Sequence, residues 1–160
     1  TSDTLMSQVT EGLIDLAVSY TPQHRSGLVV EKLAQDSLAL VSTDPATRGP
    51  WDDGYIFVDW GAEFRMGYQD AYPDQEPPAV AVSYGPLALQ HILRVGGAAY
   101  LPLRAVRPRL DEGTLHLIDS APVFRRPVFI VHLEGADNPL FQTAIEGLRQ
   151  IAREEVEGDD

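Results

Sequence analysis

The middle of the sequence alternates short apolar runs with stretches of helical length, and this alternation constrains the fold more than any other feature. We expect strands at Tyr55–Asp59, Ala79–Ser83 and Ala98–Leu101, with helices over Gly61–Tyr72 and Pro86–Val95 between them. Strands that alternate with helices through short loops favour a parallel sheet built from right-handed crossovers. The sequence therefore predicts an α/β unit in the middle of the chain.

Two segments rich in Pro, Gly or both, without apolar periodicity, flank this unit near residues 44–54 and 120–127. Segments of this composition connect elements rather than build them, so we expect the chain to cross between two lobes at these places. The first lobe is then discontinuous, with residues 1–47 plus 127–160, and the second lobe covers residues 50–123.

Local signals predict the remaining elements. Ser2 and Asp3 are N-cap residues for a helix that Gly12 ends, and the final helix begins at Pro139 and repeats its apolar residues every 3.6 positions. The other expected elements are strands at Asp15–Tyr20, Leu28–Leu33, Ser37–Ser42, Leu115–Asp119 and Val128–Leu133, a turn at Gln35-Asp36, and a turn-rich link over Val106–Gly113.

Charge and composition exclude several kinds of protein. Asp and Glu number 24 against 12 Lys and Arg, a formal net charge of −12, so the chain repels nucleic-acid phosphates and anionic membranes. The absence of Cys excludes disulfides, thiol catalysis and thiolate zinc sites. No apolar run reaches the roughly 18–20 residues of a transmembrane helix, and no signal-peptide pattern is visible. Because the first residue is Thr1, we interpret the sequence as a piece of a longer protein.

Motifs for catalysis and metal binding are missing from the sequence. The four His residues do not share metal-ligand spacing, and there is no nucleophile elbow or P-loop. Gly96-Gly97 is interpreted as a helix stop rather than part of a dinucleotide motif. We therefore expect no metal and no cofactor.

Two expected strands end in short polar turns that open helices, Asp59-Trp60-Gly61 and Ser83-Tyr84-Gly85. A helix N-terminus presents free N–H groups and the positive end of the helix dipole, which suits a carboxylate or phosphate. In a parallel sheet both turns lie at the carboxyl edge, where open α/β sheets bind ligands. Plain N-capping is the alternative explanation for the same polar residues.

Six strings follow one another along nearly the whole chain: EGLIDLAVSYTP, LVVEKLAQDSLALVS, YIFVDWGAEF, VSYGPLALQHIL, GGAAYLPLRAV and RPVFIVHLEG. Together they resemble the effector-binding (substrate-binding) domain of LysR-type transcriptional regulators. Glu11–Ala17 is similar to the G-x-L-D-x-A signature of that family's first lobe, and Gly96–Pro102 is similar to the G-x-G-x-x-x-L-P of its second lobe.

The resemblance implies a two-lobed, periplasmic-binding-protein-like (type 2) α/β fold with a small-molecule effector between the lobes. It further implies a homodimer or homotetramer formed through the effector domain, a cytoplasmic location, and DNA binding only through an N-terminal winged helix-turn-helix that this sequence lacks. The family's effector domain has one strand and one helix before the segment that matches Thr1–Thr4, so the sequence is N-terminally truncated relative to the family. We expect the shortened lobe to expose a sheet edge and to make the chain oligomeric or prone to aggregation.

Carried over position by position, the resemblance implies effector contacts at strand ends and helix starts of both lobes. The implied residues are Ser2, Thr4, Ser19, Tyr20, Trp60, Gly61, Phe64, Ser83, Tyr84, Gly85 and Tyr100. Backbone N–H groups and hydroxyls would orient an anionic or aromatic effector, the aromatic rings would set its size, and Arg65 is the nearest cation for an anionic one.

Two other functions share this fold. A solute-binding protein of a transport system has the same two-lobed plan, although the missing secretion signal counts against it. An enzyme needs acid–base residues that converge on the cleft, and Asp59 with Tyr84 is the best pair available. The prediction is a ligand-sensing domain of a regulator that is not an enzyme.

Overall fold

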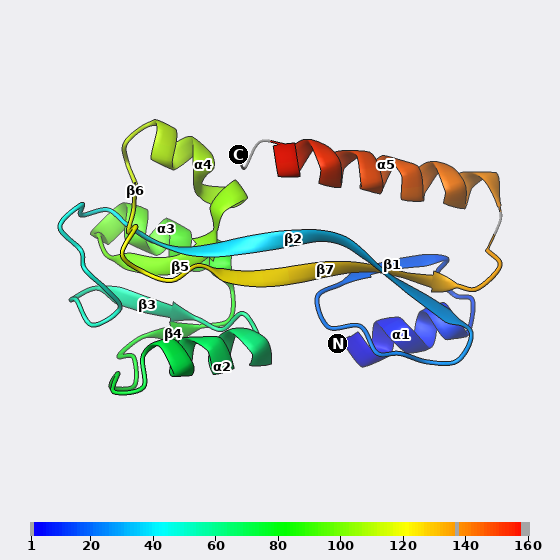
Figure 1. The fold of residues 1–160 in the computed structure, drawn as a ribbon, viewed down its shortest axis with the longest axis horizontal. Helices are drawn as coiled ribbons and strands as arrows, with labels where there is room; N and C mark the ends of the chain where they lie inside the picture. Colours follow the sequence, from blue (N-terminus) through cyan, green and yellow to red (C-terminus); the bar gives the residue numbers. More distant parts are fainter. Residues whose placement is uncertain (1, 137, 158–160) are drawn as a thin grey trace. The chain divides into compact units, whose positions relative to one another are not determined.

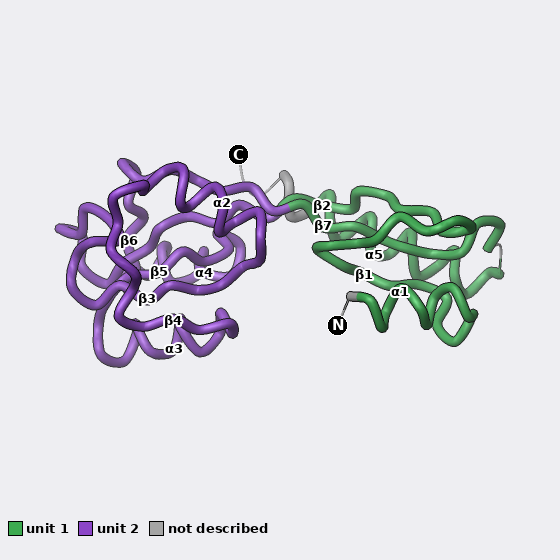
Figure 2. Tube along the Cα trace, turned by 90° about the horizontal axis from the view of Figure 1, so that it is seen from below, with its two compact units in different colours: residues 1–35, 127–160 green, residues 36–126 purple. Residues whose placement is uncertain are grey.

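The computed structural model describes residues 2–136 and 138–157. The chain divides into two compact units, unit 1 with residues 1–35 and 127–160 and unit 2 with residues 36–126 (Figure 2). The first boundary therefore lies between residues 35 and 36, earlier than the crossing that the sequence suggests near residues 44–54. The second boundary, after residue 126, lies inside the segment 120–127.

The first boundary lies inside a continuous strand, β2 (Leu28–Ser42), so the predicted turn at Gln35-Asp36 is wrong. The side chain of Asp36 is only 2% exposed. Arg104 Nε donates to Asp36 Oδ1 at 2.9 Å and Arg104 Nη2 donates to Oδ2 at 3.2 Å. A carboxylate paired in this two-pronged way can be buried in a strand, whereas a solvated Asp favours a turn.

Unit 2 is built on a sheet with the strand order β2-β5-β3-β4, and β6 pairs with β2. Its elements after β2 are β3 (Tyr55–Val58), α2 (Ala62–Ala71), β4 (Ala81–Val82), α3 (Gly85–Val95), β5 (Ala98–Pro102), α4 (Leu103–Asp111) and β6 (His116–Leu117) (Figure 1). Strand β3 runs parallel to β4 and to β5, which confirms the predicted parallel arrangement, whereas β2 runs antiparallel to β5.

Helix α4 replaces the turn-rich link that the sequence predicts over Val106–Gly113. Val106 is fully buried, and Leu110 packs against the same core cluster. Pro108 lies inside the helix, where its missing N–H removes one hydrogen bond. The apolar pair four positions apart fixes this face of the helix on the sheet and offsets that loss.

The sheet of unit 2 is buried on both faces. Along β5, Ala98 and Tyr100 join the cluster that includes residues of α2, whereas Ala99 and Leu101 join the cluster that includes residues of α3. Alternate side chains of a strand point to opposite faces. The two helices therefore cover opposite faces of the sheet, as parallel strands require.

Unit 1 contains α1 (Ser2–Thr10), β1 (Leu16–Ser19), the first part of β2, most of β7 (Phe124–Leu133) and α5 (Pro139–Glu157). Strand β1 pairs antiparallel with β7, which neighbours β2. Val131 packs in one core cluster with Met6 of α1, and its neighbour Ile130 packs in another with Phe141 and Ile145 of α5. The two helices thus cover opposite faces of this sheet. Among the described helices, none is both long and apolar enough to cross a lipid bilayer.

The Gly96-Gly97 pair ends α3 and also permits a close backbone approach. Gly96 is the C-cap residue, with φ at 89° and its N–H donating to the Ile92 carbonyl oxygen at 2.9 Å. Gly97 has φ at 128°, and a Cβ there would lie 2.2 Å from the Gly54 carbonyl oxygen. The Ala98 N–H donates to that same oxygen at 3.2 Å. This approach fixes the starts of β3 and β5 side by side.

Replacing Gly97 with Ala should therefore lower the free energy of unfolding by about 3 kcal/mol, because the new Cβ overlaps backbone that cannot move independently. Gly113→Ala is the matched control, since Gly113 also has positive φ (71°) but nothing lies within 4 Å of its Cβ position. The control should cost about 1 kcal/mol, from backbone strain alone. Urea denaturation measures both, and equal losses would contradict the close approach.

Removing Arg104 should destabilise the chain more than neutralising its partner. Arg104→Gln leaves the buried charge of Asp36 without this guanidinium and should cost about 2 kcal/mol, whereas Asp36→Asn removes the charge and should cost about 1 kcal/mol. Arg109→Gln, on the same helix, serves as control, because its ion pair with Glu112 is about half exposed and contributes little. Thermal unfolding of the three variants gives the order of their losses in stability.

Candidate functional site

The carboxyl ends of β3 and β4 bring the two predicted turns side by side. Val58 and Val82 are partners in parallel register, and the Asp59 N–H donates to the Val82 carbonyl oxygen at 2.8 Å. Asp59 and Ser83 follow these strands directly, so the two turns leave the same edge of the sheet at neighbouring positions. This is the edge at which parallel sheets commonly bind ligands.

The carboxylate of Asp59 stabilises the turn Asp59-Trp60-Gly61, which follows β3. Its Oδ1 accepts the Gly61 N–H at 3.0 Å, and Arg65 Nη1 lies 2.6 Å from Oδ1 and 2.7 Å from Oδ2. Partial burial alone would raise the pKa of Asp59, but the Gly61 N–H and the Arg65 guanidinium together lower it. An ionised, paired carboxylate is poorly suited to proton transfer near neutral pH, so the acid–base role considered for Asp59 with Tyr84 gains no support.

Trp60 is the residue through which the structure brings several predicted positions together. Its indole Nε1–H donates to the Tyr100 carbonyl oxygen at 2.8 Å. The benzene edge of the indole lies so close to Gly85 that a Cβ there would be 2.3 Å from a ring carbon. Residues of β5, the first turn and the start of α3 thus meet at one indole ring. A partly buried hydrogen bond and close packing hold this ring in a single orientation.

Phe64 and Tyr100 lie in the core of unit 2, with exposed fractions of 5% and 0%. Their ring centroids are 5.7 Å apart in an edge-to-face arrangement, and Phe124 packs against both rings. The Tyr100 hydroxyl lies 2.6 Å from the Tyr72 hydroxyl, and burial raises its pKa. Both predicted residues therefore lie within the core of unit 2.

Ser83 and Tyr84 are exposed, Tyr84 by 64%. Tyr84 is the N-cap residue of α3 and Gly61 that of α2, and within the described structure neither residue makes a side-chain capping hydrogen bond. Gly61 has no side chain to cap with, but Asp59 of the same turn accepts the Gly61 N–H at 3.0 Å, so a capping role stays the alternative for the polar residue of the first turn.

The positions predicted in unit 1 lie at the start of α1 and the end of β1. Ser2 is the first residue of α1, but its side chain lies outside the described part of the structure, and Thr4 is exposed on the same helix. Ser19 is 6% exposed, and its Oγ accepts the Thr21 N–H at 3.2 Å. Tyr20, which follows, is half-buried. The Ser19 hydroxyl therefore closes the turn after β1.

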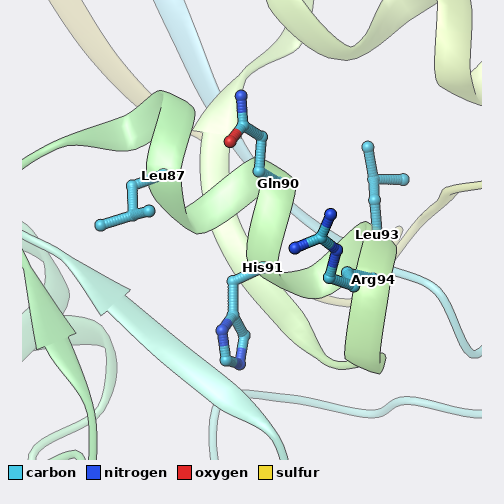
Figure 3. A pocket seen from close by; sticks show the side chains of 5 residues that line it. All are labelled: Leu87, Gln90, His91, Leu93 and Arg94. Carbon is cyan, nitrogen blue, oxygen red and sulfur yellow. The ribbon is translucent and has the colours of Figure 1, made fainter.

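Two pockets in the described structure lie away from the predicted positions. One is lined by five residues of α3, namely Leu87, Gln90, His91, Leu93 and Arg94 (Figure 3). The other is lined by residues of the segment 42–54 and by Val95, Gly96 and Gly97. Neither contains a predicted effector residue. Among the residues described, no three His, Cys, Asp or Glu side chains gather closely enough to hold a metal ion.

Arg126 is a cation next to Trp60 that the sequence did not reveal. Its guanidinium carbon lies 5.3 Å from the centroid of the Trp60 ring, within the range of a cation–π interaction. The two residues are distant in the sequence, so no local spacing connects them. The Arg-Arg pair in the Pro-flanked segment before residue 127 was the available signal, because it is a local concentration of positive charge in an acidic chain.

The chain is similar to known regulators along most of its length. Residues 1–153 match the family model of the LysR substrate binding domain. The chain is 25% identical over 147 residues to the HTH-type transcriptional regulator HdfR of Escherichia coli O139:H28, which covers 92% of this chain and 50% of HdfR. It spans about half the length of the curated relatives it matches.

Solved structures of regulators share the fold. The bromide-bound regulatory domain of HypT from Salmonella typhimurium superposes with a TM-score of 0.74 at 17% identity, covering 94% of this chain and 78% of that domain. Full-length LysG from Corynebacterium glutamicum with bound effector Arg superposes with a TM-score of 0.63 at 17% identity, covering 92% of this chain and 55% of LysG. These similarities confirm the type 2 periplasmic-binding-like fold. With a family match over residues 1–153 and this fold, the chain belongs to the LysR substrate-binding domain family.

Proposed function

We propose that the chain is the sensing part of a LysR-type transcriptional regulator, in which a small-molecule effector modulates DNA binding and transcription by the full-length protein. The match of residues 1–153 to the substrate-binding domain is the observation that carries this proposal. A ligand changes such a regulator only if it binds one conformation better than another. The sensing domain must therefore offer groups whose contacts with the ligand differ between conformations.

The two turns after β3 and β4 supply such groups in unit 2. Trp60 is fixed by a hydrogen bond and close packing, so it offers a rigid wall. Ser83 and Tyr84 are exposed in the neighbouring turn, and the start of α3 presents backbone N–H groups. We propose that the effector contacts these groups of unit 2, and that Phe64 and Tyr100 support them from the core of that unit.

Regulation of transcription is favoured over transport, because the curated relatives are transcriptional regulators. The same relatives favour a regulator over an enzyme. LysR-type regulators bind small-molecule effectors, oligomerise and bind DNA through an N-terminal domain. For the full-length protein we propose a homodimer or homotetramer, a cytoplasmic location, and DNA contact through an N-terminal winged helix-turn-helix.

Ser83→Phe should shift the effector dose–response of the full-length regulator at least tenfold to higher concentration, because the ring occupies the space at the turn after β4 where we place the effector. Ser83 is exposed, so the melting temperature should change by less than about 2 °C. Ser26→Phe, at an exposed loop position of unit 1, is the matched control. A transcriptional reporter gives the dose–response, and an unchanged curve for the Ser83 variant would argue against this ligand position.

The 160-residue chain alone should not bind duplex DNA, because its net charge of −12 repels phosphates. Its elution from a DNA column should be the same at low and at high salt. The full-length regulator is the positive control and should be retained at low salt. Salt-dependent retention of the chain alone would place DNA contacts inside this domain.

A further inference from the structure

We propose that a pocket at the amino ends of β3 and β5 is a second ligand site, and that it takes a small organic ammonium compound. The pocket is lined by residues of the segment 42–54 and by Val95, Gly96 and Gly97, and its volume is about 560 Å³. Pockets that bind small molecules have volumes of about 300–1,000 Å³. We call this pocket the amino-edge pocket. The class of its ligand follows from the helix end, the charges and the hydrogen bonds that surround it.

The amino-edge pocket is separate from the candidate effector site. Gly54 directly precedes β3 and Gly97 directly precedes β5, so the pocket lies where these two strands begin. The turns of the candidate site follow the other strand ends, after Val58 and Val82. Helix α3 begins at the candidate site and ends at the pocket, and its 11 residues rise by about 16 Å. The inference therefore does not depend on the proposed function.

Helix α3 ends at this pocket with carbonyl groups that have lost their helical partners. If the helix continued, the Gly97 and Ala98 N–H groups would pair with the carbonyl oxygens four residues earlier. Instead, the Gly97 N–H donates to Thr43 Oγ1 at 3.0 Å. The Ala98 N–H donates to the Gly54 carbonyl oxygen at 3.2 Å. A helix C-terminus with unpaired carbonyl groups carries a partial negative charge and favours a cation.

The side chains that line the pocket carry more negative than positive charge, with Asp44, Asp52 and Asp53 against one cation, Arg48. The Arg48 N–H donates to Asp52 Oδ2 at 2.6 Å, and Arg48 Nη2 donates to Oδ1 at 3.1 Å. The positive charge of Arg48 is thus balanced by Asp52. Asp44 accepts only the Ala46 N–H through its carboxylate, and Asp53 has no hydrogen bond or ion pair within the described structure. Two negative charges therefore remain without a cation.

The hydroxyl groups of the lining are used to hold the wall together. Ser42 is only 1% exposed. Its Oγ lies 2.7 Å from Thr47 Oγ1, donates to the Gly97 carbonyl oxygen at 3.2 Å and accepts the Asp44 N–H at 3.0 Å. Thr43 Oγ1 donates to the same Gly97 oxygen at 3.3 Å. The polar groups left for a ligand are therefore mainly carboxylate and carbonyl oxygens, which accept hydrogen bonds.

An ammonium group matches these oxygens, because it is positive and carries only donors. A metal ion fits less well, since no three His, Cys, Asp or Glu side chains in the described part of the chain gather closely enough to hold one. The basic residue in the last turn of α3 is Arg94. It lines the other pocket, on α3 itself (Figure 3), and is not among the residues that line the amino-edge pocket.

The test uses the 160-residue chain at about 0.15 M salt, titrated by calorimetry with putrescine, a four-carbon diamine, and with the uncharged four-carbon diol. Putrescine should bind saturably with a Kd of about 5 mM or lower, and the diol at least tenfold more weakly. Asp53→Asn should weaken putrescine at least threefold, because it removes one of the two unbalanced carboxylates. Ala46→Phe changes no charge but places a ring in the pocket lining, and should weaken putrescine at least fivefold.

Asp74→Asn is the matched control, because Asp74 is an exposed loop residue of unit 2 outside the pocket and its removal changes the net charge equally. It should alter putrescine affinity less than about 1.5-fold. All variants should melt within about 2 °C of the wild type; if Asp53→Asn fails to fold, the Ala46 variant and the diol decide. Equal losses in the Asp53 and Asp74 variants, an unchanged affinity in Ala46→Phe, equal affinity for diamine and diol, or no saturable binding at about 20 mM would each overturn the inference.

Discussion

The parallel pairing of β3 with β4 brings the two turns of the candidate site to one edge of the sheet. Because Val58 and Val82 are in register, the chain leaves both strands at one edge and enters α2 and α3 from adjacent turns. If the register between β3 and β4 shifted by one residue, Asp59 would move away from the Val82 carbonyl oxygen that now accepts its N–H. The side chains of β3 would also turn to the other face of the sheet. The close approach of Gly54 and Gly97 fixes the opposite end of β3 against β5.

Trp60 connects this edge to the core of unit 2. Its hydrogen bond to Tyr100 reaches β5, and Tyr100 packs in turn against Phe64 and Phe124. Aromatic pairs in such edge-to-face contact add about 0.5–1.5 kcal/mol each beyond their buried area. The ring that we place against the effector is therefore held by the same interactions that stabilise the domain, and a substitution there affects folding and binding together.

The sequence predicts the central strands and helices well because their apolar periods are local. It fails at Gln35-Asp36 and over 106–113, where distant contacts decide the structure. Arg104 permits Asp36 to be buried within β2, and the core cluster around Val106 overrides Pro108. At the candidate site the turns at 59–61 and 83–85 could be located from strand and helix signals. The approach of Arg126 to Trp60 could not be predicted from the sequence, because the two residues are far apart in the chain and meet only when unit 2 is folded.

The acidic charge of the domain has different consequences for a polymer and for a small molecule. A duplex presents one phosphate about every 1.7 Å along its axis and meets the charge of a whole surface, so a net charge of −12 opposes it at every approach. A small carboxylate meets mainly the groups within its own contact distance, since charges beyond about 8 Å are screened. A local cation can therefore hold a small anion in a domain whose net charge opposes nucleic acid.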